Sequence, residues 1–411
     1  MLLYFCSRVY RLLRCSFWAC IGVSLVLSPA RAQRALFDSS RYNPAVLHVR
    51  FTPAVGRTTS DASDAFLDAT LISASGDVEG VRAELSTAAF RGHLITLYRQ
   101  LSRQELLNVE DPSASSRQLY ELIFGGLADV IQREQITTLL ISADRGLQAV
   151  PFAALSDGQR FFGDRFAFAI TPSLALMDFD TQPAGQDRIL ALGASRFQGM
   201  AELPLVPQEL SRIGDSQKKD QYLNQDFTLD ALLNQGGDAR YDKIHLATHA
   251  EFKPGGPAAS RLYSGVGAVS MKELARLRQQ RKGVPLDLVV FSACRTALGD
   301  DGAELGFSGL ALQSGARSAI GTLWYVDDVA TSAYFVLLYW YLEQGVPKAN
   351  AMQLTRQAFL RGKVQLVGDQ LQGPDGQPLL TQLTSIQQRR ISDGLANPFY
   401  WAGITLMGSP Q

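Results

Sequence analysis

Apolar runs, each about as long as one β-strand, recur along the whole chain. In the first part they alternate with helical patterns at residues 89–107 and 116–132, in which apolar positions return every three to four residues. In the second part, helical stretches separate most of them. The runs predict strands at residues 46–51, 65–73, 137–142, 166–171, 189–193, 243–248, 286–292, 318–323 and 403–407. This alternation predicts an α/β fold.

The later strands are apolar at nearly every position, as residues 243–247 and 286–291 illustrate. A strand in a parallel sheet needs this pattern when helices cover both faces, because neither side meets water. Ser270-Met-Lys-Glu273 is a capping box that predicts the start of one covering helix. Other helices are expected at residues 307–314, 329–342 and 347–361, of which 329–342 is too short to span a bilayer and predicts a buried helix.

Two polar stretches divide the chain. Residues 180–187 are the best linker candidate, so we expect a smaller α/β subdomain at residues 33–180 and a second domain at 187–411. Residues 362–397 are polar and contain Gly373-Pro-Asp-Gly376, which predicts an insertion or a long loop.

The first thirty-two residues have the pattern of an export signal. Three arginines, at positions 8, 11 and 14, precede an apolar stretch at residues 17–27, and Ala30-x-Ala32 suits a signal peptidase. We expect a cleaved signal peptide at residues 1–32 and a mature protein that is periplasmic or extracellular, with no membrane span after signal removal. An uncleaved membrane anchor is the alternative.

The charge balance argues against nucleic acid as a partner. The chain has 39 basic and 39 acidic residues, and the leader holds four arginines and no acid, which leaves 35 against 39. Binding to nucleic acid or to an anionic membrane needs a clustered basic excess, and the sequence has no such stripe.

Cys294 is the one cysteine left after residue 32, so no disulfide can form within the mature chain. It follows the strand-like residues 286–292, and His249 follows the strand-like residues 243–248. Ligands of open α/β sheets bind outside the carboxyl ends of the strands, so neighbouring strands would bring the thiol and the imidazole together. A thiol next to an imidazole is a nucleophile with its base, and the backbone N–H groups of Cys294 and Ala250 are candidate oxyanion donors.

Simpler interpretations compete with this one. A free cysteine is more often buried in a core than reactive, and His245 is expected to be a core histidine. The His245-x-x-x-His249 spacing suits zinc only on a helix with an adjacent glutamate, so we expect no metal and no cofactor. Asp300, Asp327 and Trp324 are candidates for a substrate pocket. The alternatives are a solvated loop for the aspartates, a helix cap for Asp327 or Asp328, and a core position for Trp324.

Several segments together resemble the CHAT domain, a family of caspase-like and separase-like cysteine peptidases. The segments are Ser116-x-x-Leu-Tyr120, Leu147-x-x-Val-Pro-Phe-Ala-Ala-Leu155, Ile244-His-Leu-Ala-Thr-His249, Val289-Val-Phe-Ser-Ala-Cys294, the stretch Gly315-Ala-Arg-Ser-Ala-Ile-Gly-Thr-Leu-Trp-Tyr-Val-Asp-Asp328, and Asn397-Pro-Phe-Tyr-Trp-Ala402.

The resemblance implies a caspase-like three-layer sandwich with a mostly parallel central sheet, and a dyad of His249 and Cys294. It also implies that the first part is a protease-like companion subdomain. The chain departs from the family at Ala250, where glycine is usual, and an added Cβ restricts the backbone.

Two functions therefore compete. The first is an exported cysteine endopeptidase that hydrolyses a peptide or protein substrate through a thioester acyl-enzyme. The second is a catalytically silent scaffold that binds a peptide or protein partner. No tetratricopeptide-like repeat precedes residue 190, so any regulatory partner module would be a separate protein.

Overall fold

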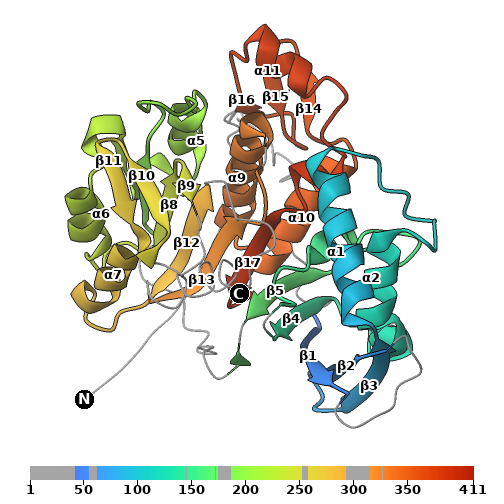
Figure 1. Ribbon diagram of the computed structural model, residues 1–411. Coiled ribbons are helices and arrows are strands. Elements are labelled where there is room, and N and C mark those ends of the chain that lie inside the picture. The colour runs from blue at the N-terminus through green and yellow to red at the C-terminus, as the bar shows by residue number, and fades with distance from the viewer. Residues whose placement is uncertain are drawn as a thin grey trace, which may run out of the picture. The chain divides into compact units, whose positions relative to one another are not determined.

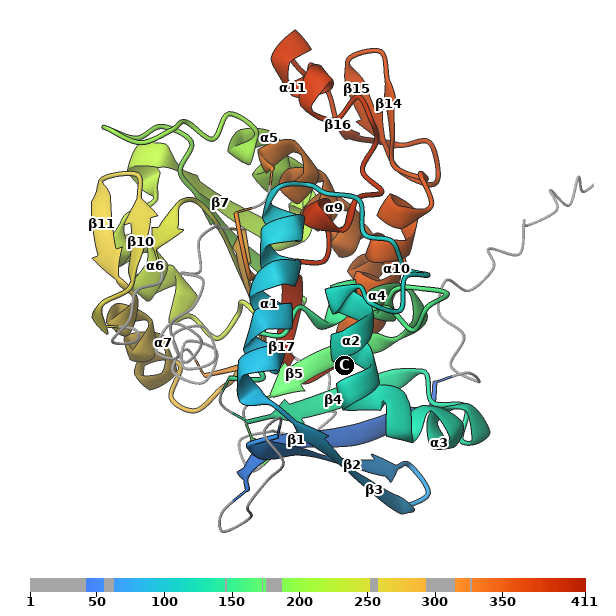
Figure 2. The same cartoon turned by 45° about the vertical axis from the view of Figure 1, so that its right-hand side comes forward.

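The computed structural model describes residues 42–54, 63–144, 146–171, 173–174, 187–251, 258–292, 315–325 and 327–411. Within these ranges an eleven-stranded sheet organises the chain from β3 at one edge to β7 at the other (Figures 1 and 2). The order across the sheet is β3 (Val78–Leu85), β2 (Ala65–Ser73), β1 (Pro44–Pro53), β4 (Thr138–Ala143), β5 (Ala167–Thr171), β17 (Ile404–Gly408), β13 (Ala316–Thr322), β12 (Leu286–Ser292), β8 (Lys243–Ala247), β6 (Ile189–Gly193) and β7 (Lys219–Leu223).

The sheet is mostly parallel, as its near-continuous apolar strands predicted. The antiparallel neighbours in this sheet are β1 with β2, β2 with β3, and β13 with β17; all other neighbours described are parallel. Because β13, β12, β8, β6 and β7 run in the same direction, their carboxyl ends meet at one edge of the sheet. That edge is where a ligand is expected in an open α/β sheet.

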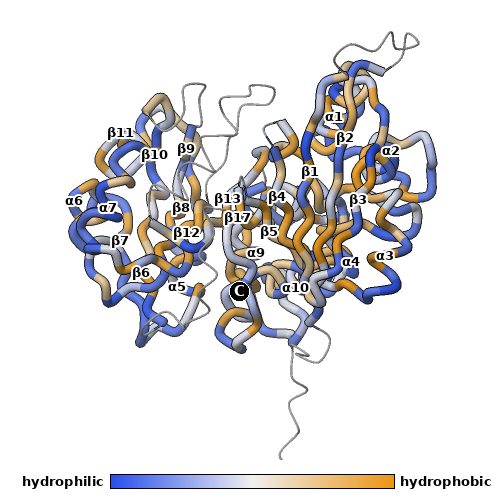
Figure 3. The backbone as a smooth tube through the Cα atoms, turned by 90° about the horizontal axis from the view of Figure 1, so that it is seen from below, coloured by the Kyte–Doolittle hydropathy of each residue, from blue (hydrophilic) through white to orange (hydrophobic). Residues whose placement is uncertain are grey.

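Helices cover both faces of the second part of the sheet, which makes three layers. Successive residues of β6 enter different cores: Ile189 and Ala191 pack in one cluster, and Leu190 and Leu192 in the other. The first core includes residues of α5 (Val206–Arg212), α9 (Asp328–Glu343) and α10 (Lys348–Leu360), and the second includes residues of α6 (Leu229–Gly236) and α7 (Ala275–Gln280). Figure 3 shows apolar positions gathered along β4, β5 and α9, with polar positions on the outer turns. The predicted buried helix is α9, which begins at Asp328.

The helices of the first part differ in detail from the prediction. The expected helix at residues 89–107 is α1 (Thr87–Ser102), which ends earlier. The one expected at 116–132 is broken into α2 (Ser115–Phe124), a 3₁₀ turn at Gly125–Leu127, and α3 (Ala128–Arg133). The break falls at two consecutive glycines, which after proline favour the helix least, and a Cβ on Gly126 would lie 3.0 Å from the Val81 side chain.

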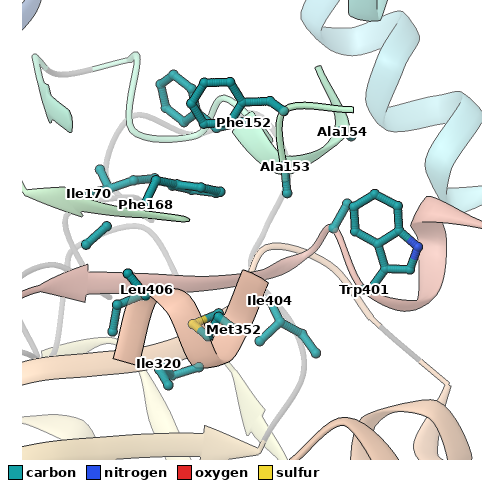
Figure 4. Close-up of a cluster of buried hydrophobic side chains, with 14 of the residues drawn as sticks. Phe152, Ala153, Ala154, Phe168, Ile170, Ile320, Met352, Trp401, Ile404 and Leu406 are labelled. Atoms are coloured by element: carbon teal, nitrogen blue, oxygen red, sulfur yellow. The ribbon is translucent and has the colours of Figure 1, made fainter. Parts of the chain in front are cut away.

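Both expected parts of the chain contribute strands to the one sheet. They meet at β5 and β17, which run parallel to each other. Every residue of β5 is buried, and so are residues 404–407 of β17. Figure 4 shows the side chains around this junction: Phe168 and Ile170 of β5, Ile404 and Leu406 of β17, and Met352 of α10. The short helix α4 (Phe162–Arg165) also contacts α10. Residues 1–32 and 175–186, which hold the predicted signal and most of the predicted linker, lie outside the described residues, so both remain predictions.

A three-stranded sheet stands at the carboxyl end of β8. It consists of β9 (Ala250–Glu251), β10 (Arg261–Ser264) and β11 (Gly267–Ser270), in the order β11, β10, β9. The capping box predicted after it is wrong, because the Ser270 hydroxyl is buried without a partner in the structure. Ser270 still pairs with Arg261 as part of β11, and the chain continues into a 3₁₀ turn, Met271–Leu274, before α7. The first turn of that helix is therefore not the α-turn that a capping box requires.

Residues 362–397 form an ordered insertion rather than a long loop. The insertion contains β14 (Gln365–Val367), β15 (Gln370–Gln372), β16 (Pro378–Leu380) and α11 (Ser385–Arg390). Thr384 and Gln387 form a capping box at the start of α11. Figures 1 and 2 show these elements gathered above the ends of α9 and α10.

Candidate active site

His249 follows a strand that is paired with the strand preceding the cysteine. β8 and β12 are parallel neighbours, and Ala247 lies opposite Ser292 in their register. His249 comes two residues after Ala247, and Cys294 comes two residues after Ser292. The predicted adjacency of the two strands is therefore confirmed, whereas Cys294 and Asp300 themselves lie outside the described residues.

The His249 ring has a defined orientation and tautomer. Its Nε2 atom lies 2.8 Å from the backbone oxygen of Ala201, and the Phe197 ring packs against it with centroids 4.6 Å apart. A carbonyl oxygen only accepts hydrogen bonds, so Nε2 carries the proton and donates it. In the neutral ring, Nδ1 is then the unprotonated nitrogen. Its lone pair can accept a proton from an acid.

Hydrogen bonds fix the backbone next to His249. The Thr248 N–H donates to the Ser292 carbonyl at 3.2 Å, and the Thr248 hydroxyl donates to the Tyr263 carbonyl. The Tyr263 N–H donates to the His249 carbonyl at 3.0 Å. The histidine is thereby tied to β12 on one side and to β10 on the other.

Ala250 is buried and extended, and it opens β9 opposite Leu262 of β10. In an antiparallel ladder, residue pairs that share hydrogen bonds alternate with pairs that share none. Tyr263 and His249 share a hydrogen bond, so the next pair, Leu262 and Ala250, shares none. The Ala250 N–H therefore points away from β10. Its backbone is not in the left-handed region, so this position does not require the glycine that is usual in the family.

A cavity opens beside His249, and its empty space of about 420 Å³ includes the part that is open to solvent. One wall comes from α5 and the segment before it, another from the first turns of α9, and the base from the ends of β8 and β12. The described residues that line it are Leu203, Leu205, Val206, Glu209, Thr248, His249, Ser292, Tyr325, Asp328, Thr331 and Ser332.

A buried carboxylate lies in the lining of this cavity. Glu209, only 1% exposed, accepts a hydrogen bond from the Ser332 hydroxyl at 2.6 Å and lies 2.8 Å from Nε2 of His245. The Nδ1 atom of His245 has no hydrogen-bond partner in the structure. A buried N–H without an acceptor is costly, so the proton is expected on Nε2 and not on Nδ1. His245 is thus the core histidine that was predicted, and Glu209 is a buried acidic side chain beside the cavity.

Comparison with known proteins identifies the family. The CHAT domain family model matches residues 113–409, which is most of the chain. The chain belongs to the CHAT domain family. A search of curated proteins gives no match.

Among solved structures, two of the Saccharomyces cerevisiae separase–securin complex contain chains similar to this CHAT protein. Each has a TM-score of 0.53 and 11% sequence identity, and the match covers 90% of this chain but only 30% of the other. The crystal structure of the Arg-specific cysteine proteinase gingipain R matches with a TM-score of 0.41 and 9% identity over 79% of this chain and 75% of that one. The CHAT chain has a caspase-like α/β fold, and it spans about a third of the separase chain that it matches.

In this CHAT chain the predicted pocket residues have different positions. Asp327 caps α9, which is the alternative that the sequence left open for it, and accepts from the N–H groups of Val329 and Ala330 at 2.9 and 3.2 Å. Burial raises the pKa of the Asp327 carboxyl above its ordinary value, although the nearby Arg390 opposes this. Its neighbour Asp328 lines the cavity and forms an ion pair with Arg390.

Trp324 packs in the core and does not line this cavity. Its indole N–H donates to the Phe399 carbonyl at 3.1 Å, and its ring meets Tyr98 edge-on with centroids 5.8 Å apart. The indole also lies against Gly403, where a Cβ would approach it to 2.6 Å. This is the core position that the sequence left as the alternative.

Sequence reasoning missed Glu209, Ser332 and the Ala201 carbonyl. Glu209 carried one usable signal: it stands three residues after Val206 and one before Leu210, on the apolar face of a short helix. A carboxylate on such a face needs buried partners. The partners come from distant parts of the chain, so the sequence does not name them.

Neither a metal centre nor a membrane span is found in the described part of the chain. No group of three or more histidine, cysteine, aspartate or glutamate side chains there is placed to hold a metal ion. No helix within those ranges is long and apolar enough to cross a bilayer.

Proposed function

We propose that this CHAT protein is a cysteine endopeptidase in which Cys294 is the nucleophile and His249 its base. The parallel register of β8 and β12 is the observation that carries the proposal. His249 and Cys294 each follow, by two residues, one member of the Ala247–Ser292 pair. Two residues extend at most about 7 Å, so both side chains start from the same edge of the sheet within reach of one cavity.

The tautomer of His249 suits this role. With Nε2 donating to Ala201, Nδ1 takes the proton of the Cys294 thiol, and the thiolate attacks the peptide carbonyl carbon. The imidazolium then gives its proton to the leaving amine as the C–N bond breaks, which leaves a thioester. A water molecule, deprotonated by His249, hydrolyses the thioester and restores the thiol.

The oxyanion formed during attack needs hydrogen-bond donors. The Ala250 N–H is directed away from the β10 ladder and belongs to the residue next to His249, which supports it as one donor. The Cys294 N–H is the second donor in this proposal. Donors of this kind act through the backbone and do not require a particular side chain.

The cavity favours a basic substrate side chain. Glu209 in its lining is a buried acidic side chain, and Asp328, which is paired with Arg390, lines the same cavity. A carboxylate in a site with little water attracts a guanidinium or ammonium strongly, because the effective dielectric constant is low. Asp300 and Asp327 would add to the negative potential around the site, Asp327 from its position as the cap of α9.

The site of action in this proposal is outside the cytoplasm. The arginine-led apolar stretch and Ala30-x-Ala32 support export of the mature chain to the periplasm or beyond. The three cysteines of residues 1–32 would leave with the signal, so Cys294 would have no partner for an internal disulfide.

A peptide-cleavage assay tests the proposal. The mature chain, Cys294→Ala and His249→Ala are each incubated with a diverse peptide mixture, and the products are identified by mass spectrometry. We expect cleavage by the mature chain alone, with basic residues enriched before the cut bond. Equal products from all three proteins contradict the proposal.

The silent-scaffold alternative predicts a different result. Cys294 would then react slowly with iodoacetamide in the native protein and quickly after unfolding, and no peptide would be cut. Rapid native alkylation that depends on His249 contradicts the scaffold.

A further inference from the structure

The insertion touches both walls of the cavity that lies beside His249. One wall is α5, whose Val206 and Glu209 line the cavity, and the other is the start of α9, whose Asp328 and Ser332 line it. The two walls also pack against each other directly, and within that contact the Ser332 hydroxyl donates to Glu209.

The contact with α5 is a two-way hydrogen bond. The Gln208 side-chain amide donates to the Thr381 carbonyl at 2.8 Å, and the Thr381 N–H donates to the Gln208 side-chain oxygen at 3.0 Å. Arg212, one helical turn further on, donates to the Pro378 carbonyl at 2.6 Å. Gln208 therefore faces the insertion, while the next residue, Glu209, faces the cavity.

The contact with α9 is an ionic one. Arg390 of α11 forms ion pairs with both carboxylates at the start of α9, at 3.2 Å from Asp327 and in direct contact with Asp328. Asp327 caps α9, so its ion pair binds Arg390 to the first turn of that helix.

Hydrogen bonds hold the stretch between these two contacts. Thr381 and Arg390 are separated by eight residues, which include the capping box of Thr384 and Gln387. The Gln388 side chain donates to the Leu383 carbonyl at 2.6 Å, and the Tyr400 hydroxyl holds the Arg390 carbonyl at 3.1 Å. A segment held at both ends in this way can pass a displacement from one end to the other.

We propose that the insertion is a clamp that sets the separation of α5 and α9, with Gln208 and Arg390 as its two positioning residues. The width of the cavity, and through it the side chains that the cavity accepts, then depends on contacts made outside it. Only this consequence for peptide selection rests on the proposed peptidase function.

Hydrogen exchange of the full mature chain tests the clamp without requiring catalysis. The variants are Gln208→Ala and Arg390→Gln, with Arg389→Gln as the control, because Arg389 is an exposed neighbour on α11 that makes no ion pair among the described residues. Thermal unfolding verifies that all three are folded. Exchange is followed in peptides that cover α5 and the first turns of α9.

The deciding result is the hydrogen-exchange rate in the wall on the far side of the clamp from each substitution. That wall is α5 for Arg390→Gln and the first turn of α9 for Gln208→Ala. We expect Arg390→Gln to speed exchange in α5, and Gln208→Ala to speed it in the first turn of α9, each about three- to tenfold over wild type. Arg389→Gln should match wild type at both walls. Faster exchange confined to the wall next to each substitution overturns the clamp.

Peptide selection gives a second readout. In Gln208→Ala the ratio of kcat/KM for peptides cut after arginine to those cut after alanine should fall at least about threefold, while Arg389→Gln keeps the wild-type ratio. An unchanged ratio with faster exchange at both walls removes the link to selectivity. A wild-type protein that cuts no peptide contradicts the proposed peptidase and leaves the exchange result to decide the clamp.

Discussion

The Nε2 nitrogen of His245 lies 2.8 Å from a carboxylate oxygen of Glu209, and both side chains are buried. The histidine comes from β8 and the glutamate from α5, and the second carboxylate oxygen is held by Ser332 of α9. This contact joins three elements of the core at the cavity lining. It satisfies a charged group that would otherwise be costly to bury.

Glu209→Leu should therefore destabilise the protein strongly. The substitution leaves the His245 N–H and the Ser332 hydroxyl without an acceptor, for a loss of about 2–4 kcal/mol in the free energy of unfolding. Urea unfolding at pH 7 measures it. The double variant Glu209→Leu with His245→Phe should recover part of the loss, since it removes one of the stranded donors. Equal stability of wild type and Glu209→Leu would show that the contact does not hold the core.

Two substitutions at Ala250 separate the backbone donor from the fold. Ala250→Pro removes the N–H that points away from β10, and an edge strand tolerates proline where the N–H is outside the ladder. We expect kcat to fall about 100-fold or more with only a small change in melting temperature. Ala250→Gly keeps the N–H and should retain activity. If Ala250→Pro remains as active as wild type, the oxyanion is held by other groups.

Asp68 should make stability depend on pH at the far end of the sheet. A hydrogen bond from Arg82, together with one from Thr52 and the charges of Arg82 and Arg50, lowers the pKa of Asp68 to about 2 in the folded protein. The carboxylate therefore stabilises the fold above the unfolded pKa of 3.8, and this contribution is lost as the pH falls toward 2.

Asp68→Asn should accordingly cost about 1–3 kcal/mol at pH 7 and progressively less between pH 4 and pH 2. Glu79→Gln on the neighbouring β3, where Glu79 is exposed, should cost little at either pH. Urea titrations from pH 2 to pH 7 provide the comparison. A cost of Asp68→Asn that does not vary with pH would contradict the assignment.

The cap of α9 can be tested by removing its charge and its acceptor separately. Asp327→Ala loses the side-chain acceptor for the Val329 and Ala330 N–H groups and should cost about 1–2 kcal/mol. Asp327→Asn keeps an acceptor and should cost less, because burial already raises the pKa of the Asp327 carboxyl and disfavours its charge. Thermal unfolding of both variants measures the difference. Equal losses for Asn and Ala would show that the cap acceptor contributes little and would assign the stabilisation to the ion pair with Arg390, which both variants lose.

The sequence predicted the strands well because burial on both faces leaves an unmistakable pattern. Residues 65–73, 189–193 and 286–292 were predicted with the bounds that the structure has. The position of His249 followed from the same pattern, since it comes just after one of these near-continuous apolar strands. Local chemistry was less reliable: Ser270 matches a capping box in sequence, but its place in β11 prevents the α-turn that the box requires.

The lining of the cavity could not be predicted from the sequence. Along the chain, His245 is 36 residues from Glu209, and Ser332 is 123 residues from it. Only packing brings the three side chains together. Trp324 and Asp328 illustrate the same limit over four residues. The first is buried against Tyr98 and Gly403, and the second lines the cavity, because the chain leaves β13 at Thr322 and enters α9 at Asp328.

The most direct test of the account is covalent trapping of Cys294. The mature protein is treated with a set of peptidyl acyloxymethyl ketones that differ in the residue before the reactive ketone, and the adduct is mapped by mass spectrometry. The thiolate displaces the carboxylate of the reagent and forms a thioether. We predict one adduct, on Cys294, fastest with a basic residue and slowed about 100-fold or more in His249→Ala. Labelling of Cys294 at the same rate in His249→Ala, and with no preference among the peptides, would contradict the proposed dyad.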